Sequence, residues 1–202
     1  MRTGGEHVGP QAVRRRQSPG QGHGGVLAAR IRRRLARHAR RGHRPRPGIL
    51  YGAFGGKDAL FRRALDHYST TYGARYEDAL TAHPGDPVRA IEAFFEVILA
   101  RIDDPAVPKG CLIAQSAAQA AVLTSNSATH VRGLLDLQHA RIRAALDDPH
   151  VDPAMLDDLA TYIVAINQSL AVLSRAGASD AELRAVVRLA CETVANRLTP
   201  AH

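Results

Sequence analysis

The sequence contains two thiols, Cys111 and Cys191, which are the side chains best suited to covalent chemistry. A thiol becomes a nucleophile only where a base or a positive field lowers its pKa. Both cysteines lie in apolar stretches with helical periodicity, so we interpret them as buried, unreactive thiols, with a catalytic role as the alternative. Two cysteines also exclude a disulfide-rich secreted scaffold and predict a reduced, cytoplasmic protein.

Other patterns that could carry chemistry are weaker. Gly20, Gly22 and Gly25 match the dinucleotide-binding pattern G-x-G-x-x-G, but no strand precedes them and no βαβ unit follows. The histidines of residues 1–47 show no metal-ligand spacing. Three acid pairs fall at predicted helix ends, where they suit caps and turns: Asp103/Asp104, Asp147/Asp148 and Asp157/Asp158. The sequence therefore predicts no enzyme, no cofactor and no metal site.

The positive charge of the chain is confined to its beginning. Residues 1–47 contain 13 arginines and one acid, a net +12, so residues 48–202 carry −4 and the whole chain +8. Residues 1–47 also lack Phe, Tyr and Trp. Residues 1–45 are therefore expected to form a disordered basic arm. The alternative is an arginine-rich helix over 26–41 that lies on nucleic acid or an anionic surface.

Hydrophobic periodicity predicts an all-α protein from residue 48 onward. We expect helices near 58–80, 87–103, 111–123, 127–146, 153–176 and 180–198, and no sheet. Asp86-Pro87 and Asp152-Pro153 are typical helix starts, and Ser125 or Asn126 is expected to cap another helix. No apolar run reaches the roughly 20 residues that span a membrane, so no membrane partner is expected.

The run from Arg46 to Phe61, RPGILYGAFGGKDALF, resembles the end of the helix-turn-helix of TetR/AcrR-type transcriptional regulators. That family reads approximately R-P/G-x-L-Y-x-x-F-x-x-K-x-x-L at this place. Gly110-Cys111-Leu112-Ile113 also resembles a segment of AcrR-like members, and the resemblance covers residues 46–202. It implies a TetR-like helical regulatory domain, double-stranded DNA and a small-molecule effector as partners, and action as a repressor.

The resemblance also implies residue roles. Pro47 and Gly48 would begin the recognition helix next to Arg46, close to the major groove, and Tyr51 and Lys57 would contact phosphates. Without the resemblance, Tyr51 reads as a surface aromatic and Lys57 as a solvated charge.

Residues 1–45 depart from the family pattern, because the two helices expected before the recognition helix have no counterpart there. Their Arg, Gly, Pro, His and Ala content is typical of a GC-rich gene translated in the wrong frame, with the true frame entered near Arg46. We expect three parts: the basic arm 1–45, an incomplete helix-turn-helix region 46–80, and a ligand-binding and dimerisation domain 81–202. The alternative function is a dimeric ligand-binding module without specific DNA binding. A small-molecule enzyme is a third hypothesis, for which no catalytic constellation is found.

An effector pocket is expected between the 87–103 helix and the helices that follow it. Its apolar side would come from the first helix and its hydrogen bonds from glutamines of the others. The predicted residues are Phe94, Phe95, Ile98, Leu112, Gln115, Gln119, Leu135 and Gln138. The alternative is that the two phenylalanines simply fill the core.

A homodimer is expected through the last two helices. The seam from Leu156 to Leu173 has a second, weaker apolar face beside it, which includes Tyr162 and Val172. A helix that is apolar on two sides usually packs on two sides. The predicted interface residues are Tyr162, Ile166, Leu170, Leu173, Leu183, Val187 and Val194. The alternative is that both helices only complete a monomeric core.

Overall fold

The computed structural model describes residues 54–198, and this part of the chain is all-α. Its elements are α3 (Lys57–Thr81), α4 (Pro87–Asp103), α5 (Leu112–Ala118), a 3-10 turn (Ala120–Val122), α6 (Ser125–Ala145), α7 (Pro153–Ala176) and α8 (Asp180–Leu198). Within residues 54–198 there is no strand. None of the helices described is long and apolar enough to cross a membrane.

Local capping sets most helix starts where the sequence predicts them. The Asp86 carboxylate accepts a hydrogen bond of 3.0 Å from the Arg89 amide at the start of α4. Asp152 does the same for the Ala154 amide at the start of α7. Both caps precede a proline at the first helical position, where its missing N–H costs nothing.

The stretch expected as one helix over 111–123 differs in the structure. α5 ends after seven residues, and a 3-10 turn of three residues follows it. No residue of that turn is buried, so no apolar stripe holds the segment in a longer helix. The next cap is Thr124, not Ser125 or Asn126: its hydroxyl accepts a hydrogen bond from the Ser127 amide.

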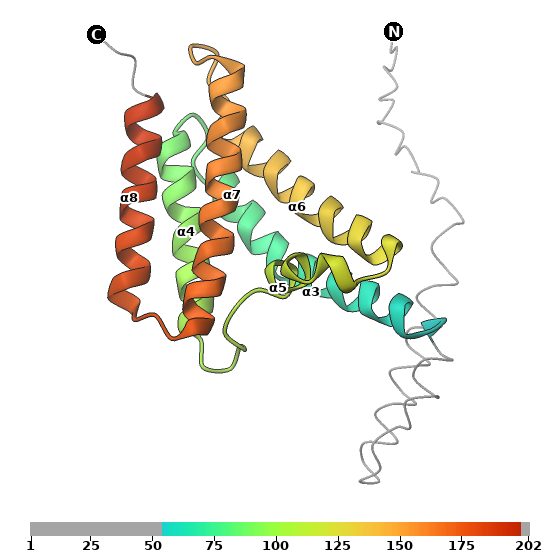
Figure 1. Ribbon diagram of the computed structural model, residues 1–202. Coiled ribbons are helices and arrows are strands. Elements are labelled where there is room, and N and C mark those ends of the chain that lie inside the picture. Colours follow the sequence, from blue (N-terminus) through green and yellow to red (C-terminus); the bar gives the residue numbers. More distant parts are fainter. Residues whose placement is uncertain (1–53, 199–202) are drawn as a thin grey trace, which may run out of the picture. The chain divides into compact units, whose positions relative to one another are not determined.

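The helices pack in two sets that share a core (Figure 1). α4, α7 and α8 run alongside one another, and α8 contacts both α4 and α7. α3 packs along α4 and α6, and α6 packs on α7. The short α5 contacts α6, α7 and α3.

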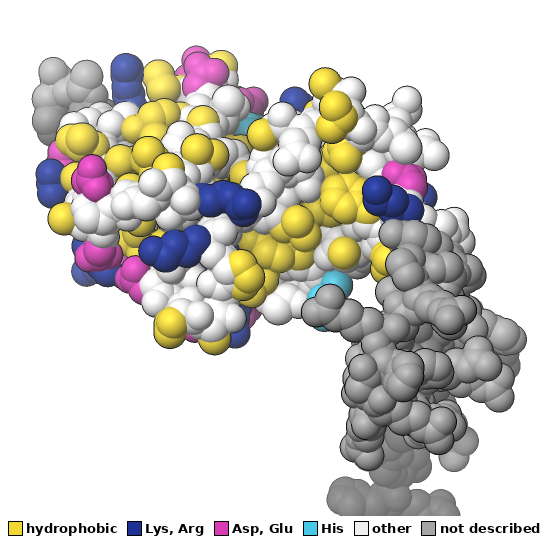
Figure 2. Space-filling model, turned by 60° about the horizontal axis from the view of Figure 1, so that its bottom comes forward, with side chains coloured by type: hydrophobic (Ala, Val, Ile, Leu, Met, Phe, Trp, Pro, Cys, Tyr) yellow, Lys and Arg dark blue, Asp and Glu magenta, His cyan; other side chains and the backbone are white. Residues whose placement is uncertain are grey.

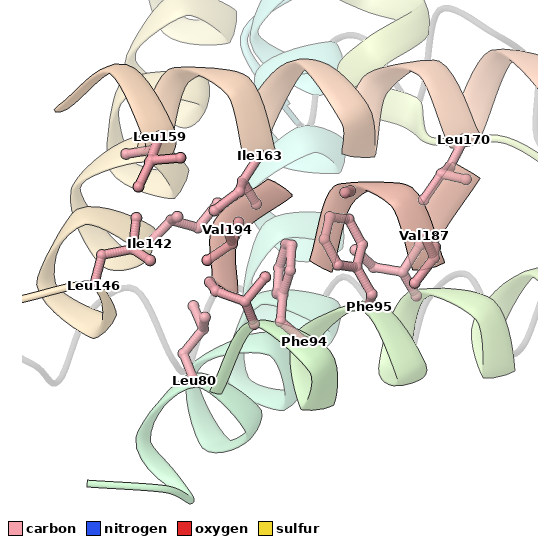
Figure 3. Close-up of a cluster of buried hydrophobic side chains, with 14 of the residues drawn as sticks. Leu80, Phe94, Phe95, Ile142, Leu146, Leu159, Ile163, Leu170, Val187 and Val194 are labelled. Carbon is pink, nitrogen blue, oxygen red and sulfur yellow. The ribbon is translucent and has the colours of Figure 1, made fainter. Parts of the chain in front are cut away.

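The core lies where α4 faces α7 and α8. Phe94 and Phe95 are fully buried on α4, and Phe95 points into this space beside Val187 (Figure 3). Leu170 of α7 and Val187 of α8 lie on the Phe95 side, and Leu80 of α3 lies near Phe94. The packing follows from the 3–4 spacing of apolar residues in each helix, which places them on one face.

α3 ends at Thr81, one residue past the domain boundary expected at residue 80. Leu65, Ala79 and Leu80 are buried along it, and the compact unit to which α3 belongs begins at Gly55. The division into 46–80 and 81–202 stays a prediction, and the basic arm 1–45 lies outside the described residues.

Candidate functional site

Three tyrosines of α3 line one wall of a cavity inside the bundle. Tyr68, Tyr72 and Tyr76 follow one another every four residues, so they share the helix face turned toward α4 and α6. The Tyr68 and Tyr72 rings are 4.7 Å apart between centroids. Tyr76 meets Phe94 of α4 edge-to-face at 5.5 Å. Such contacts hold the aromatic wall in one arrangement.

The opposite wall contains a buried cation. Arg101 lies seven residues after Phe94 on α4, on the same face, and its exposed fraction is only 6%. Its Nη1 donates a hydrogen bond of 2.8 Å to the Gly110 carbonyl, and its guanidinium carbon lies 5.6 Å from the centre of the Tyr72 ring. Its Nε is buried and has no hydrogen-bond partner within residues 54–198.

The loop before α5 is shaped to meet this arginine. Gly110 has φ +96°, a conformation that side chains rarely adopt. A Cβ on Gly110 would also lie 2.8 Å from Nε2 of Gln115. Glycine therefore lets the chain turn here and present its carbonyl to Arg101.

The cavity as a whole is apolar, positively charged and narrow. Its lining is completed by Ser69, Gly73, Leu80, Cys111, Ile113, Leu134, Leu137, Gln138, Arg141 and Asn167. Two arginines but no Asp or Glu belong to the lining. It has about 40 Å³ of free space, enough for a few water molecules, and about 610 Å³ when its open mouth is included.

Burial keeps the tyrosine hydroxyls protonated. It raises the pKa of Tyr68 well above its usual range, and the neighbouring Cys111 adds to the effect. Burial also raises the pKa of Tyr76. The Tyr68 hydroxyl is buried and makes no hydrogen bond of good geometry within the described part of the chain. It is therefore a neutral donor that faces the cavity without a partner.

The second cavity arginine is already neutralised. Nη2 of Arg141 lies 3.0 Å from the Glu77 carboxylate, one of the pairs that join α6 to α3. Gly73 of α3 makes room for this side chain, since a Cβ there would be 3.0 Å from Nη1 of Arg141. Arg141 thus closes one side of the cavity, and Arg101 supplies the positive charge that no described acid balances.

The fold and the cavity can be compared with known proteins. No family model matches the sequence, and no curated protein matches it. Among solved structures, the chain is similar to a double cysteine mutant of the TetR family transcriptional regulator CifR, solved with a 26-base-pair double-stranded operator DNA. The identity is 26%, the TM-score 0.62, and the match covers 73% of this chain and 79% of that one. A triple cysteine mutant of CifR with the same length of operator DNA matches over the same shares at 25% identity and TM-score 0.62.

The chain is a transcriptional regulator with the TetR-type fold. The two agreeing matches span nearly four fifths of the CifR chain, as the resemblance of residues 46–202 leads us to expect. These neighbours are transcriptional regulators and not enzymes, in agreement with the missing catalytic constellation.

The structure brings two of the expected pocket residues of this regulator to the cavity, Phe94 and Gln138. Phe95 and Ile98 instead fill the core, with exposed fractions of 0% and 1%. Gln115 accepts a hydrogen bond of 2.7 Å from Arg175. Leu112, Gln119 and Leu135 do not belong to the cavity lining. Whether any of them meets a ligand stays a prediction.

The cavity residues of α3 and the arginine of α4 were not among the residues predicted from the sequence. Two signals were available. Tyr68, Tyr72 and Tyr76 have a four-residue spacing, and Arg101 occurs on an apolar face seven residues after Phe94. An arginine on such a face is either paired or functional.

The residues expected to contact DNA lie mostly outside the described part of the regulator. Arg46, Pro47, Gly48 and Tyr51 all precede residue 54. Lys57 is the first residue of α3 and is exposed. Their roles stay predictions.

The start of α3 is tied to α6 through Asp58. This carboxylate accepts hydrogen bonds of 2.6 Å from the Thr124 hydroxyl and 2.5 Å from the Ser127 hydroxyl, and it pairs with Arg62. The hydrogen bonds from Ser127 and Thr124 lower the pKa of Asp58. These hydrogen bonds join the first turn of α3 to the first turn of α6.

The expected dimer residues divide into two groups. The first group is buried in the core of the single chain: Leu170, Leu183, Val187 and Val194. These residues could not contact a partner directly and could only hold the interface residues in position. Tyr162 and Ile166 are half-buried, and Leu173 is exposed. Large apolar side chains also reach the surface at Val172 of α7 and Leu189 of α8. The dimer itself stays a prediction.

The two thiols are half-buried. Burial raises the pKa of Cys191 to about 11, and the nearby Glu92 and Glu96 add to the effect. This fits the interpretation of Cys191 as an unreactive thiol. Within residues 54–198, no three His, Cys, Asp or Glu side chains gather as metal ligands.

Proposed function

We propose that this regulator binds specific double-stranded DNA as a homodimer and represses transcription until a small molecule enters the cavity beneath α3. The observation that carries the proposal is the match to CifR, a regulator solved on its operator, over 79% of that chain. The cavity would bind the effector, and the predicted contact residues before α3 would bind the DNA.

α3 supplies the physical link between these two places. It begins at Lys57, directly after the segment of predicted DNA contacts Arg46, Pro47, Gly48 and Tyr51. Its later turns, from Tyr68 to Leu80, line the cavity. A helix of 25 residues is about 38 Å long and moves as a rigid body, so a ligand that displaces its middle also displaces its start.

A dimer would set the spacing of the two DNA-contacting segments. In helix-turn-helix dimers the recognition helices meet successive major grooves about 34–36 Å apart. Exposed apolar residues on α7 and α8, Val172, Leu173 and Leu189, support an interface on these helices. On the face in Figure 2, hydrophobic side chains reach the surface among lysines and arginines.

The test is a selection of duplexes from a random pool by the full chain. We expect a two-fold symmetric sequence, with specific binding at least about a thousandfold tighter than nonspecific binding. Binding of all duplexes with equal affinity and a steep salt dependence would contradict specific recognition.

That contrary result would support a dimeric ligand-binding module that does not recognise an operator. The composition of residues 1–45, which carries no helix pattern of the family, favours this second candidate. The same selection with a chain whose first 45 codons are read in the alternative frame separates the two. Recovery of a symmetric site only by the reframed chain would assign the loss to residues 1–45.

A further inference from the structure

The cavity contains a buried positive charge that no described carboxylate balances. Arg101 is 94% buried, and no Asp or Glu of residues 54–198 forms an ion pair with it. An arginine stays protonated in a protein, and an unpaired buried charge is costly. The Tyr72 ring and the Gly110 carbonyl offset only part of this cost, since neither carries a negative charge.

The hydrogen-bond donors of the cavity that have no partner indicate which chemical group a ligand would need. Nη1 of Arg101 is occupied by Gly110, and the Tyr76 hydroxyl interacts with the guanidinium, but the buried Nε has no partner among the described residues. An arginine Nε–H is a donor that a carboxylate oxygen accepts. The Tyr68 hydroxyl adds a second buried donor without a partner. Asn167 of α7 and Gln138 of α6 bring amide groups to the same cavity.

The remaining lining is suited to an apolar body. Tyr72, Tyr76 and Phe94 present aromatic rings, and Ile113 and Leu134 add aliphatic surface. A cation would be repelled by Arg101 and would find no carboxylate in the lining. A phosphate dianion would need more positive charge than Arg101 alone provides, because Arg141 is paired with Glu77.

We propose that the cavity binds an organic carboxylate with an aromatic or short aliphatic body, its carboxylate held by Arg101 and Tyr68. This inference rests on the proposed function, because it names the chemical class of the effector of that same cavity. The enclosed part of the cavity has about 40 Å³ of free space and the whole about 610 Å³ with its open mouth, so the carboxylate would lie inside and the body would extend toward the mouth. The body would contact the later turns of α3, the helix that begins at Lys57.

The experiment measures thermal stabilisation and calorimetric affinity of the full chain with matched probes. The carboxylates are phenylacetate and hexanoate, and the neutral controls are phenylacetamide and hexanamide, each at up to about 10 mM. We expect the carboxylates to raise Tm in a concentration-dependent way and the amides to have no effect. An equal response to the amides, or no response to either carboxylate, overturns the proposal.

Variants assign the response to the residues. Arg101→Gln keeps a donor for Gly110 but removes the charge, and should weaken carboxylate binding by at least about tenfold. Tyr68→Phe removes only the unpartnered hydroxyl, so the fold is kept, and should weaken binding by about threefold or more. Arg143→Gln is the matched control, because Arg143 pairs with Asp147 and Asp157 outside the cavity lining, and should bind as the parent chain does. Unchanged carboxylate affinity in Tyr68→Phe and Arg101→Gln overturns the assignment.

The outcomes also separate this inference from the proposed function. A carboxylate that binds through Arg101 but leaves DNA affinity unchanged supports the ligand class and contradicts its regulatory role. A neutral amide that releases DNA and binds without Arg101 supports regulation through a small molecule and overturns the carboxylate.

Discussion

Two buried polar side chains, rather than the apolar core, indicate where this regulator would bind a ligand. Arg101 and Tyr68 each have a buried donor atom without a hydrogen-bond partner among the described residues, and both side chains line the cavity. Such groups are costly in a folded protein and persist where a ligand uses them. Asp58 is the opposite case: its carboxylate is fully used to tie α3 to α6.

At this scale we predict that Asp58→Asn lowers Tm and removes a pH-dependent part of the stability. The pKa of Asp58 is lower in the folded chain than its ordinary 3.8, so its contribution is complete above pH 3.8 and disappears as the pH falls through the folded pKa. Thermal melts of the parent chain and the variant should therefore differ most above pH 3.8 and approach each other as the pH is lowered further.

Asp136→Asn serves as the control, because Asp136 forms an exposed pair with Arg132 within α6. Its effect should be within about 1 kcal/mol at neutral pH. Melting curves of Asp58→Asn that run parallel to those of the parent chain at every pH would show that the Asp58 hydrogen bonds do not stabilise the fold.

At the scale of elements, α4 joins the core to the cavity. One side of the helix carries Phe95 and Ile98 into the core with α7 and α8, and the neighbouring side carries Phe94 and Arg101 to the cavity. α5 has a different character: it has seven residues, of which only Ala114 and Ser116 are buried. The core holds α4 rigidly, while α5 has little burial to hold it in place.

We predict that Phe95→Ala destabilises the chain by about 3–5 kcal/mol, because it removes a fully buried ring and leaves a cavity between α4, α7 and α8. Urea denaturation followed by circular dichroism measures the change. Val122→Ala, at a side chain that is 81% exposed, should change stability by less than about 0.5 kcal/mol. A loss of under 1 kcal/mol for Phe95→Ala would mean that the Phe95 site collapses around the smaller side chain.

At the scale of the whole molecule, the surface of α7 and α8 is the candidate dimer face. Val172 and Leu189 are 60% and 57% exposed, and the two helices that carry them are packed side by side. Apolar residues exposed together on neighbouring helices are typical of association surfaces. Because the core residues Leu170 and Val194 already have their partners within one chain, the outer residues are the ones that can be tested cleanly.

We predict that Val172→Asp together with Leu189→Asp converts a dimer into a monomer at micromolar concentration, since two carboxylates would be buried without partners at the interface. Light scattering gives the mass, and circular dichroism should stay unchanged because neither side chain is in the core. Val122→Asp, on the 3-10 turn after α5, should keep the parent mass. A parent chain that already has the mass of a monomer would contradict the dimer.

Most helices of this regulator, and its resemblance to TetR-type proteins, could be predicted from the sequence alone. Caps such as Asp86-Pro87 and Asp152-Pro153 act within one turn, and the 3.6-residue periodicity is local, so both can be read without knowing the fold. The run from Arg46 to Phe61 pointed to TetR-type regulators because spacing within one segment needs no tertiary context.

Which apolar residues fill the core and which polar ones line the cavity depends on how the helices pack, so the sequence could not predict it. Phe94 and Phe95 are adjacent in sequence, yet a rotation of about 100° along α4 sends one toward the cavity and the other toward α8. Arg101, Tyr68 and Asn167 come from three helices, and their meeting depends on how α3, α4 and α7 pack. Local periodicity predicts the face of each helix, but the neighbour that this face meets is set by packing at long range.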